Sequence, residues 1–128
     1  MFKKEKLQTG KIINLAKGFN ELAVAGEKEG MPAKLSYKLA RQILKLEDAV
    51  NSFQTQADNI LKKYGKEDES TPGSYMITDV NSYKLEIQSL EAIEEEVDLL
   101  CDKIKLEEIE GVKVKPSTLM ILQEYIEE

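Results

Sequence analysis

Carboxylates are the side chains of this chain that come closest to a chemical site. The sequence holds 24 Asp and Glu, and a dense group contains Glu91, Glu94, Glu95, Glu96 and Asp98. Paired carboxylates can act as general acid and base, or can bind Mg²⁺ or Ca²⁺ through oxygen atoms alone. On a helix, only Glu91 with Glu94 or Glu95, and Glu94 with Asp98, would share a face. This spacing favours a solvated acidic face over a metal or acid–base site.

Other side chains with chemical potential are scarce. The chain has no His and one Cys, Cys101. The lack of His excludes Ser-His-Asp and Cys-His catalytic groups and the Glu-x-x-His ligands of di-iron bundles. A lone Cys cannot form a Cys-rich zinc site, and we expect Cys101 to be a small buried hydrophobe. Glycine-rich phosphate-binding motifs are missing. We therefore expect no enzyme activity, no cofactor and no metal.

A long helix is the clearest structural prediction. From Leu39 to Tyr64 apolar residues recur at alternating steps of four and three, which is typical of one continuous helical stripe. Pro32 suits the start of this helix and Gly65 its end, so we predict a helix over residues 33–64. The stripe has two interpretations, an internal seam of a monomeric bundle or an intermolecular coiled coil.

The neighbouring segments predict further helices around this one. Apolar spacing favours an earlier helix over residues 4–25, and the short connection to Pro32 predicts an antiparallel hairpin over 4–64. Residues 65–77 form an acidic loop with a short extended stretch at its end. A third helix is expected over 79–96, and residues 97–110 suit either more helix or short extended pieces. A terminal helix begins at Pro116.

The predicted fold class is therefore mainly α, as a single domain over residues 1–128 whose part from 78 onwards is acidic and helical.

Charge is divided along the chain. Residues 1–64 hold 12 basic and 7 acidic side chains, whereas residues 65–128 hold 6 and 17. The acidic half faces either the basic hairpin or a basic partner. The terminal helix has apolar residues beyond its own stripe, which leaves assembly into oligomers open. The candidate interaction surface consists of Glu91, Glu94, Glu95, Asp98, Ile121 and Tyr125.

Targeting and nucleic-acid signals are missing. No apolar run is long enough to cross a bilayer, and the basic start of the chain lacks the apolar segment of a secretory signal. The basic residues do not alternate with stacking aromatics, so we expect no direct nucleic-acid binding. One Cys and no signal predict a reducing, cytoplasmic location and no membrane association.

The strings MPAKLSYKLARQILKLEDAVNSFQTQADNILKKYGKEDE and EEEVDLLCDKIKLEEIEGVKVKPSTLMILQEYIEE carry a family resemblance. The chain resembles, from Leu7 to Glu128, small helical proteins of unknown function that phages and prophages encode, many of them in Gram-positive bacteria. The resemblance implies a phage origin, a helical hairpin followed by a smaller α or α+β portion, and a short extended piece near 97–106. It supplies no functional residues.

These observations together predict a non-enzymatic phage or prophage accessory protein that binds other proteins in particle assembly or host interaction, inside the host bacterial cell. Its partner is a phage or host protein, and a second copy of the chain is one candidate. The main alternative is an acidic inhibitor of a host defence or nucleic-acid enzyme that imitates DNA. A carboxylate- or metal-dependent enzyme is a distant alternative.

Overall fold

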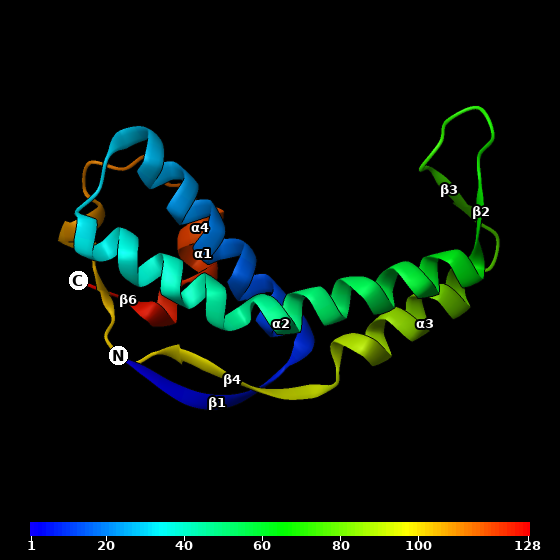
Figure 1. Cartoon of the computed structure of the whole chain (residues 1–128), viewed down its shortest axis with the longest axis horizontal. Coiled ribbons are helices and arrows are strands. Elements are labelled where there is room, and N and C mark those ends of the chain that lie inside the picture. The colour runs from blue at the N-terminus through cyan, green and yellow to red at the C-terminus, as the bar shows by residue number, and fades with distance from the viewer.

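Helices account for most of the chain, as expected for a mainly α fold. The computed structural model describes residues 1–128. Three two-stranded sheets accompany the helices: β1 pairs with β4, β2 with β3, and β5 with β6 (Figure 1). The elements in chain order are β1 (Phe2–Gln8), α1 (Thr9–Glu29), α2 (Ala33–Tyr64), β2 (Gly65–Glu67), β3 (Tyr75–Ile77), α3 (Val80–Glu91), β4 (Glu94–Leu100), β5 (Ile104–Lys105), the 3₁₀ helix Leu106–Ile109, α4 (Pro116–Ile121), the 3₁₀ helix Gln123–Tyr125 and β6 (Ile126–Glu127).

The long central helix has the predicted bounds. Helix α2 runs from Ala33 to Tyr64, between Pro32 and Gly65. Its 32 residues correspond to a length of about 48 Å. Its first half is buried at Leu39 and Leu46, whereas the apolar stripe beyond that point is only half-buried.

The first helix begins later than predicted. Residues Phe2–Gln8 form strand β1, and α1 starts at Thr9. The Thr9 backbone N–H and Oγ1 both donate to the carbonyl of Ile93, at 2.7 Å each. These two hydrogen bonds hold the end of β1 beside the start of β4, and α1 begins directly after the strand.

The third helix ends earlier than predicted. Helix α3 stops at Glu91, and Glu94–Leu100 is a strand antiparallel to β1, from Phe2 opposite Leu100 to Gln8 opposite Glu94. The expected helix through residue 96 is therefore wrong. The helical spacing of residues 83–97 is overridden by pairing with a strand almost ninety residues earlier in the chain. Of the two alternatives for residues 97–110, the extended one is confirmed at β4 and β5.

The expected helical portion from residue 78 onwards is mostly not helical. Helix α4 begins at Pro116 as predicted but ends at Ile121. The chain then makes a 3₁₀ turn and ends in β6, which pairs in parallel with β5. At the far end of α2, Tyr75–Ile77 is extended as predicted and forms a hairpin with β2.

The molecule consists of a head and a projecting arm (Figure 1). The head comprises residues 1–46 and 92–128, and its core gathers apolar side chains of α1, the first half of α2, β4 and the C-terminal segments. The arm comprises residues 47–91, with α3 along the second half of α2 and the β2–β3 hairpin at its tip. No helix has the length and apolar composition that a membrane span requires.

Candidate functional site

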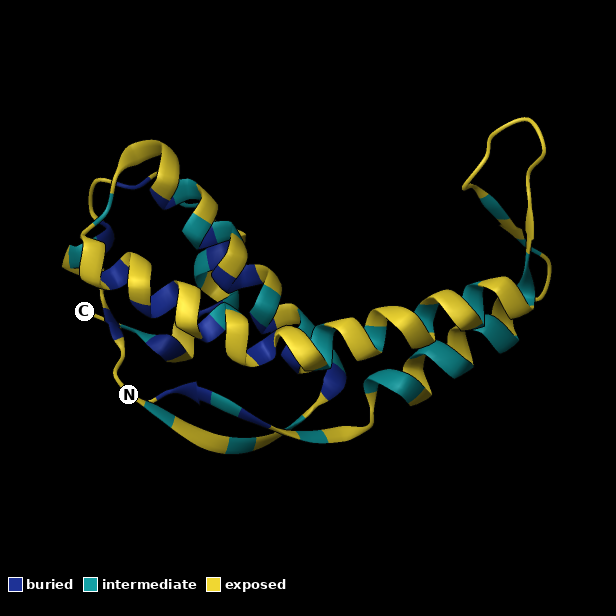
Figure 2. Ribbon diagram, viewed as in Figure 1, coloured by how far each residue is buried: buried dark blue, intermediate teal, exposed yellow.

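The arm has no buried residue. Every buried side chain lies at or before Leu46, or at or after Val97. Figure 2 shows the same division, because the buried colour is confined to the head and the arm is half-buried or exposed. Two helices side by side cannot enclose a core. The apolar surface of the arm therefore remains in partial contact with solvent.

The seam between the two arm helices is apolar and half-buried. It consists of Val50, Phe53, Ala57, Ile60, Leu61 and Tyr64 of α2 with Tyr83, Ile87 and Leu90 of α3. At the distal end, the Lys63 ammonium lies 2.8 Å from the Glu86 carboxylate. The hydrogen bond between them lowers the pKa of Glu86 and raises the pKa of Lys63. This exposed ion pair joins the distal end of α2 to the middle of α3.

The outward face of α3 carries a single charge. Its exposed residues are Val80, Asn81, Lys84, Leu85, Gln88 and Ser89, and of these only Lys84 is charged. Leu85 lies next to Lys84 on this face with 63% of its surface exposed. The facing stretch of α2 is similar, because residues 49–61 contain a single charged residue, Asp58. A third of all residues in the chain are charged, so this surface is unusually poor in charge.

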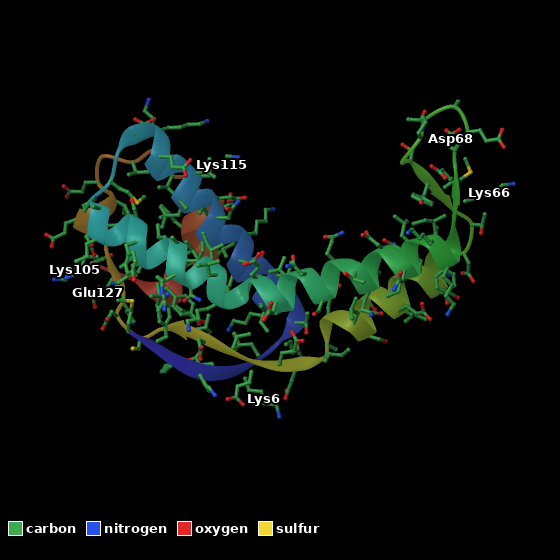
Figure 3. All side chains as sticks on the ribbon, viewed as in Figure 1. Lys6, Lys66, Asp68, Lys105, Lys115 and Glu127 are labelled. Atoms are coloured by element: carbon green, nitrogen blue, oxygen red, sulfur yellow. The ribbon has the colours of Figure 1, made fainter.

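Local sequence explains why α3 forms here. The Asp79 carboxylate accepts a hydrogen bond from the backbone N–H of Ser82 at 3.1 Å, which caps the first turn. Hydrogen bonding to Ser82 also lowers the pKa of Asp79. At the tip, Asp68 accepts bonds from the backbone and hydroxyl of Ser70, and Gly73 takes a positive φ that closes the loop (Figure 3 labels Asp68).

The predicted acidic residues lie in the head, on β4, and most face a lysine. Lys6 lies 3.6 Å from Glu94, and Lys45 lies 3.7 Å from Asp98. Glu96 is similarly 3.9 Å from an ammonium of β1. A strand places Glu94, Glu96 and Asp98 on one face and turns Glu95 to the other. The carboxylates are therefore brought together differently from the predicted helical face, and lysines partly neutralise them.

The remaining predicted surface residues are less accessible. Glu91 packs against Gly10 at the junction of arm and head, and the Glu95 carboxylate lies 3.4 Å from the Thr9 hydroxyl. Ile121 packs closely against α1. Tyr125 belongs to the core, where its ring makes an edge contact with Phe19. Burial, followed by the charges of Glu5 and Glu124, raises the pKa of Tyr125 to about 12.

The sequence prediction missed the charge-poor surface of the arm and misjudged the exposure of Cys101 as well as that of Tyr125. The signal for the arm surface was present, as a run of uncharged side chains in a highly charged chain. Cys101, expected to be buried, is exposed. No three His, Cys, Asp or Glu side chains lie close enough together to hold a metal ion.

Comparison with protein-family models, curated proteins and solved structures finds no match to the chain.

Proposed function

We propose that this protein is a non-enzymatic binding protein that engages a protein partner through its arm. The observation that carries the proposal is the absence of any buried residue between Leu46 and Val97, in a segment whose helices are amphipathic. Helices of this length gain most of their stability from packing, so a partner that covers the arm would stabilise it.

The composition of the arm surface supports a protein partner. The centres of protein–protein interfaces are depleted in charged residues and rich in apolar contacts. The outward face of α3 has one charged residue, Lys84, among uncharged residues that include Leu85, and Met76 and Ile93 are exposed near the two ends of α3. A nucleic acid would require several basic side chains on this face, which has only one.

The family resemblance suggests the setting of this interaction. We propose an accessory role in phage or prophage biology, in particle assembly or in host interaction, with a phage or host protein as partner. A second copy of the chain is one candidate. We rank the acidic inhibitor lower, because Glu94, Glu96 and Asp98 each lie within 4 Å of a lysine. A DNA mimic needs carboxylates that are free to face a basic groove.

The test compares Leu85→Glu with Met120→Glu. Both residues are 63% exposed, but Leu85 lies on the arm and Met120 on α4 of the head. Self-association is measured by sedimentation velocity, and partner binding by co-purification from the source cells. We expect Leu85→Glu to lose at least ten-fold in binding, because it places a charge at the centre of the interface.

Circular dichroism establishes that both variants keep the native helix content. Met120→Glu is expected to bind normally. Full binding by Leu85→Glu, or an equal loss in both variants, would reject the arm as the binding surface.

A further inference from the structure

Strand β1 has an open edge. The ladder to β4 is bracketed by the Thr9 N–H to Ile93 carbonyl bond, at 2.7 Å, and the Cys101 N–H to Met1 carbonyl bond, at 2.9 Å. Both bonds use odd-numbered residues of the N-terminal segment. Because hydrogen-bonded pairs alternate in antiparallel ladders, the backbone groups of the even-numbered residues, Phe2, Lys4, Lys6 and Gln8, point away from β4.

The opposite edge of this two-stranded sheet is covered by α2 at Asp98 and Leu100. The Gln42 side chain of α2 donates from Nε2 to the Asp98 carbonyl at 3.0 Å and accepts from the Leu100 N–H at 2.8 Å. The outward backbone groups of Lys4 and Lys6 make no hydrogen bond within the chain. Figure 1 shows the first part of β1 along the outer margin of the molecule, with β4 between it and α2, before the two strands cross. New strand pairing is therefore available at β1.

The charges on β1 specify which segment fits. The Lys4 and Lys6 side chains are 73% and 70% exposed, and on the β4 side they face Glu96 and Glu94 at 3.9 and 3.6 Å. Lys6 lies at the outer margin in Figure 3. On the open side the same two ammonium groups have no carboxylate. A strand on that side with acidic residues at alternate positions would repeat the arrangement of β4.

We propose that the open edge of β1 receives an acidic extended segment of a partner protein as a third strand, in a second interaction independent of the arm. Backbone hydrogen bonds to Lys4 and Lys6 provide affinity, and their ammonium groups select carboxylates two residues apart. An exposed edge strand is a template for such addition.

A second copy of the chain fits this edge poorly. In two-fold antiparallel pairing through the even-numbered residues, the central registers place Lys4 opposite Lys4, Lys4 opposite Lys6, or Lys6 opposite Lys6 of the other copy. Like charges directly opposite each other destabilise a sheet. Charge complementarity therefore favours an acidic strand over β1 of another copy.

The experiment titrates the full-length protein with an eight-residue peptide of Glu residues alternating with Thr and Val. A peptide with Lys in place of Glu is the charge control. Amide exchange and chemical shifts are followed by NMR. We expect the acidic peptide to slow exchange of the Lys4 and Lys6 amides at least ten-fold and to bind more weakly as salt rises. The Lys peptide is expected to have no effect.

Two variants test the backbone pairing and the charge at this edge. Lys6→Pro removes one outward N–H together with one ammonium group, without removing a bond to β4, and is expected to abolish binding while circular dichroism stays native. The second variant keeps both outward N–H groups and reverses the charge. Lys4→Glu with Lys6→Glu is expected to weaken binding at least ten-fold. Its matched control is Lys113→Glu with Lys115→Glu, two exposed head lysines at the same spacing, which is expected to bind normally.

Three results would overturn the proposal. They are no protection of Lys4 and Lys6 at millimolar peptide, equal binding of the Lys peptide, and a dimer in sedimentation that Lys6→Pro abolishes. The last result would assign the edge to a second copy. Leu85→Glu is expected to leave peptide binding unchanged, so failure of the arm proposal is distinguishable from failure of this one.

Discussion

Gln42 is the side chain whose replacement tests the packing of the head most sharply. It is fully buried on α2, and its amide bonds both the Leu100 N–H and the Asp98 carbonyl of β4. Gln42→Met has a similar length and volume but neither a strong donor nor a strong acceptor. The variant therefore leaves two backbone groups of β4 without partners while largely preserving the packing around the side chain.

The cost follows from those two groups. A buried polar group left without a hydrogen bond costs about 1–3 kcal/mol, so the loss of two such bonds is expected to lower the free energy of unfolding by about 2–6 kcal/mol. A domain of this size has a total stability of about 5–15 kcal/mol. We therefore expect Gln42→Met to fold at 25 °C with a much lower urea midpoint.

Urea unfolding followed by circular dichroism measures this loss. Gln54→Met is the matched control, because Gln54 lies on the same helix but makes only an exposed hydrogen bond, to Asp58 at 3.0 Å. We expect the control to lose less than about 0.5 kcal/mol. Faster amide exchange at Leu100 in Gln42→Met locates the effect on β4. A loss below about 1 kcal/mol, or equal losses in both variants, would refute the role assigned to Gln42.

Three further predictions concern α1, the core and the arm. Gly18→Ala is expected to lose about 1–2 kcal/mol in urea unfolding, because a Cβ would lie 2.7 Å from a methyl carbon of α4; Gly26→Ala, whose Cβ would meet a flexible Met side chain, is expected to lose none. The raised pKa of Tyr125, about 12, means that the folded state holds this proton more tightly. The stabilisation of the folded state by the protonated Tyr125 is complete below pH 10 and is lost as pH rises towards 12. The free energy of unfolding of the wild type, measured in urea, should therefore fall by about 2 kcal/mol relative to that of Tyr125→Phe over this interval. The same pH dependence of unfolding free energy in both proteins would contradict this. Hydrogen bonding to Lys63 lowers the pKa of Glu86. The ionised Glu86 therefore stabilises the arm at pH values above the usual Glu pKa, and this stabilisation is lost as pH drops below it. Glu86→Gln should remove this dependence and speed amide exchange in α3 but not in the head, and unchanged exchange would oppose the assignment.

The long helix could be predicted from sequence because its information is local. The steps of three and four from Leu39 to Tyr64, together with Pro32 and Gly65, determine both its existence and its ends. A similar spacing recurs in residues 83–97, but it did not determine the structure at the end of that segment. Strand pairing with β1 competes with helix formation in that segment, and hydrophobic periodicity carries no information about such a distant partner.

The residues of the candidate site could likewise be predicted only in part. Charge counts along the chain found the acidic residues, but Glu94 was placed on a helix and the structure at Asp98 was left open, without the lysines that face both residues on the folded protein. Tyr125 was taken for surface, because its burial depends on packing against Phe19 of another element. The charge-poor surface of the arm could have been found from composition alone, since residues 49–61 hold a single charged residue in a highly charged chain.

The measurement that tests the arm most directly is photocrosslinking from single positions. A photoreactive phenylalanine analogue replaces Leu85 in one variant and Met120 in another, and each protein is irradiated in its source cells. We expect a discrete covalent adduct with one protein, either a partner or a second copy, from position 85 and none from position 120. No adduct from position 85, or the same adducts from both positions, would contradict it.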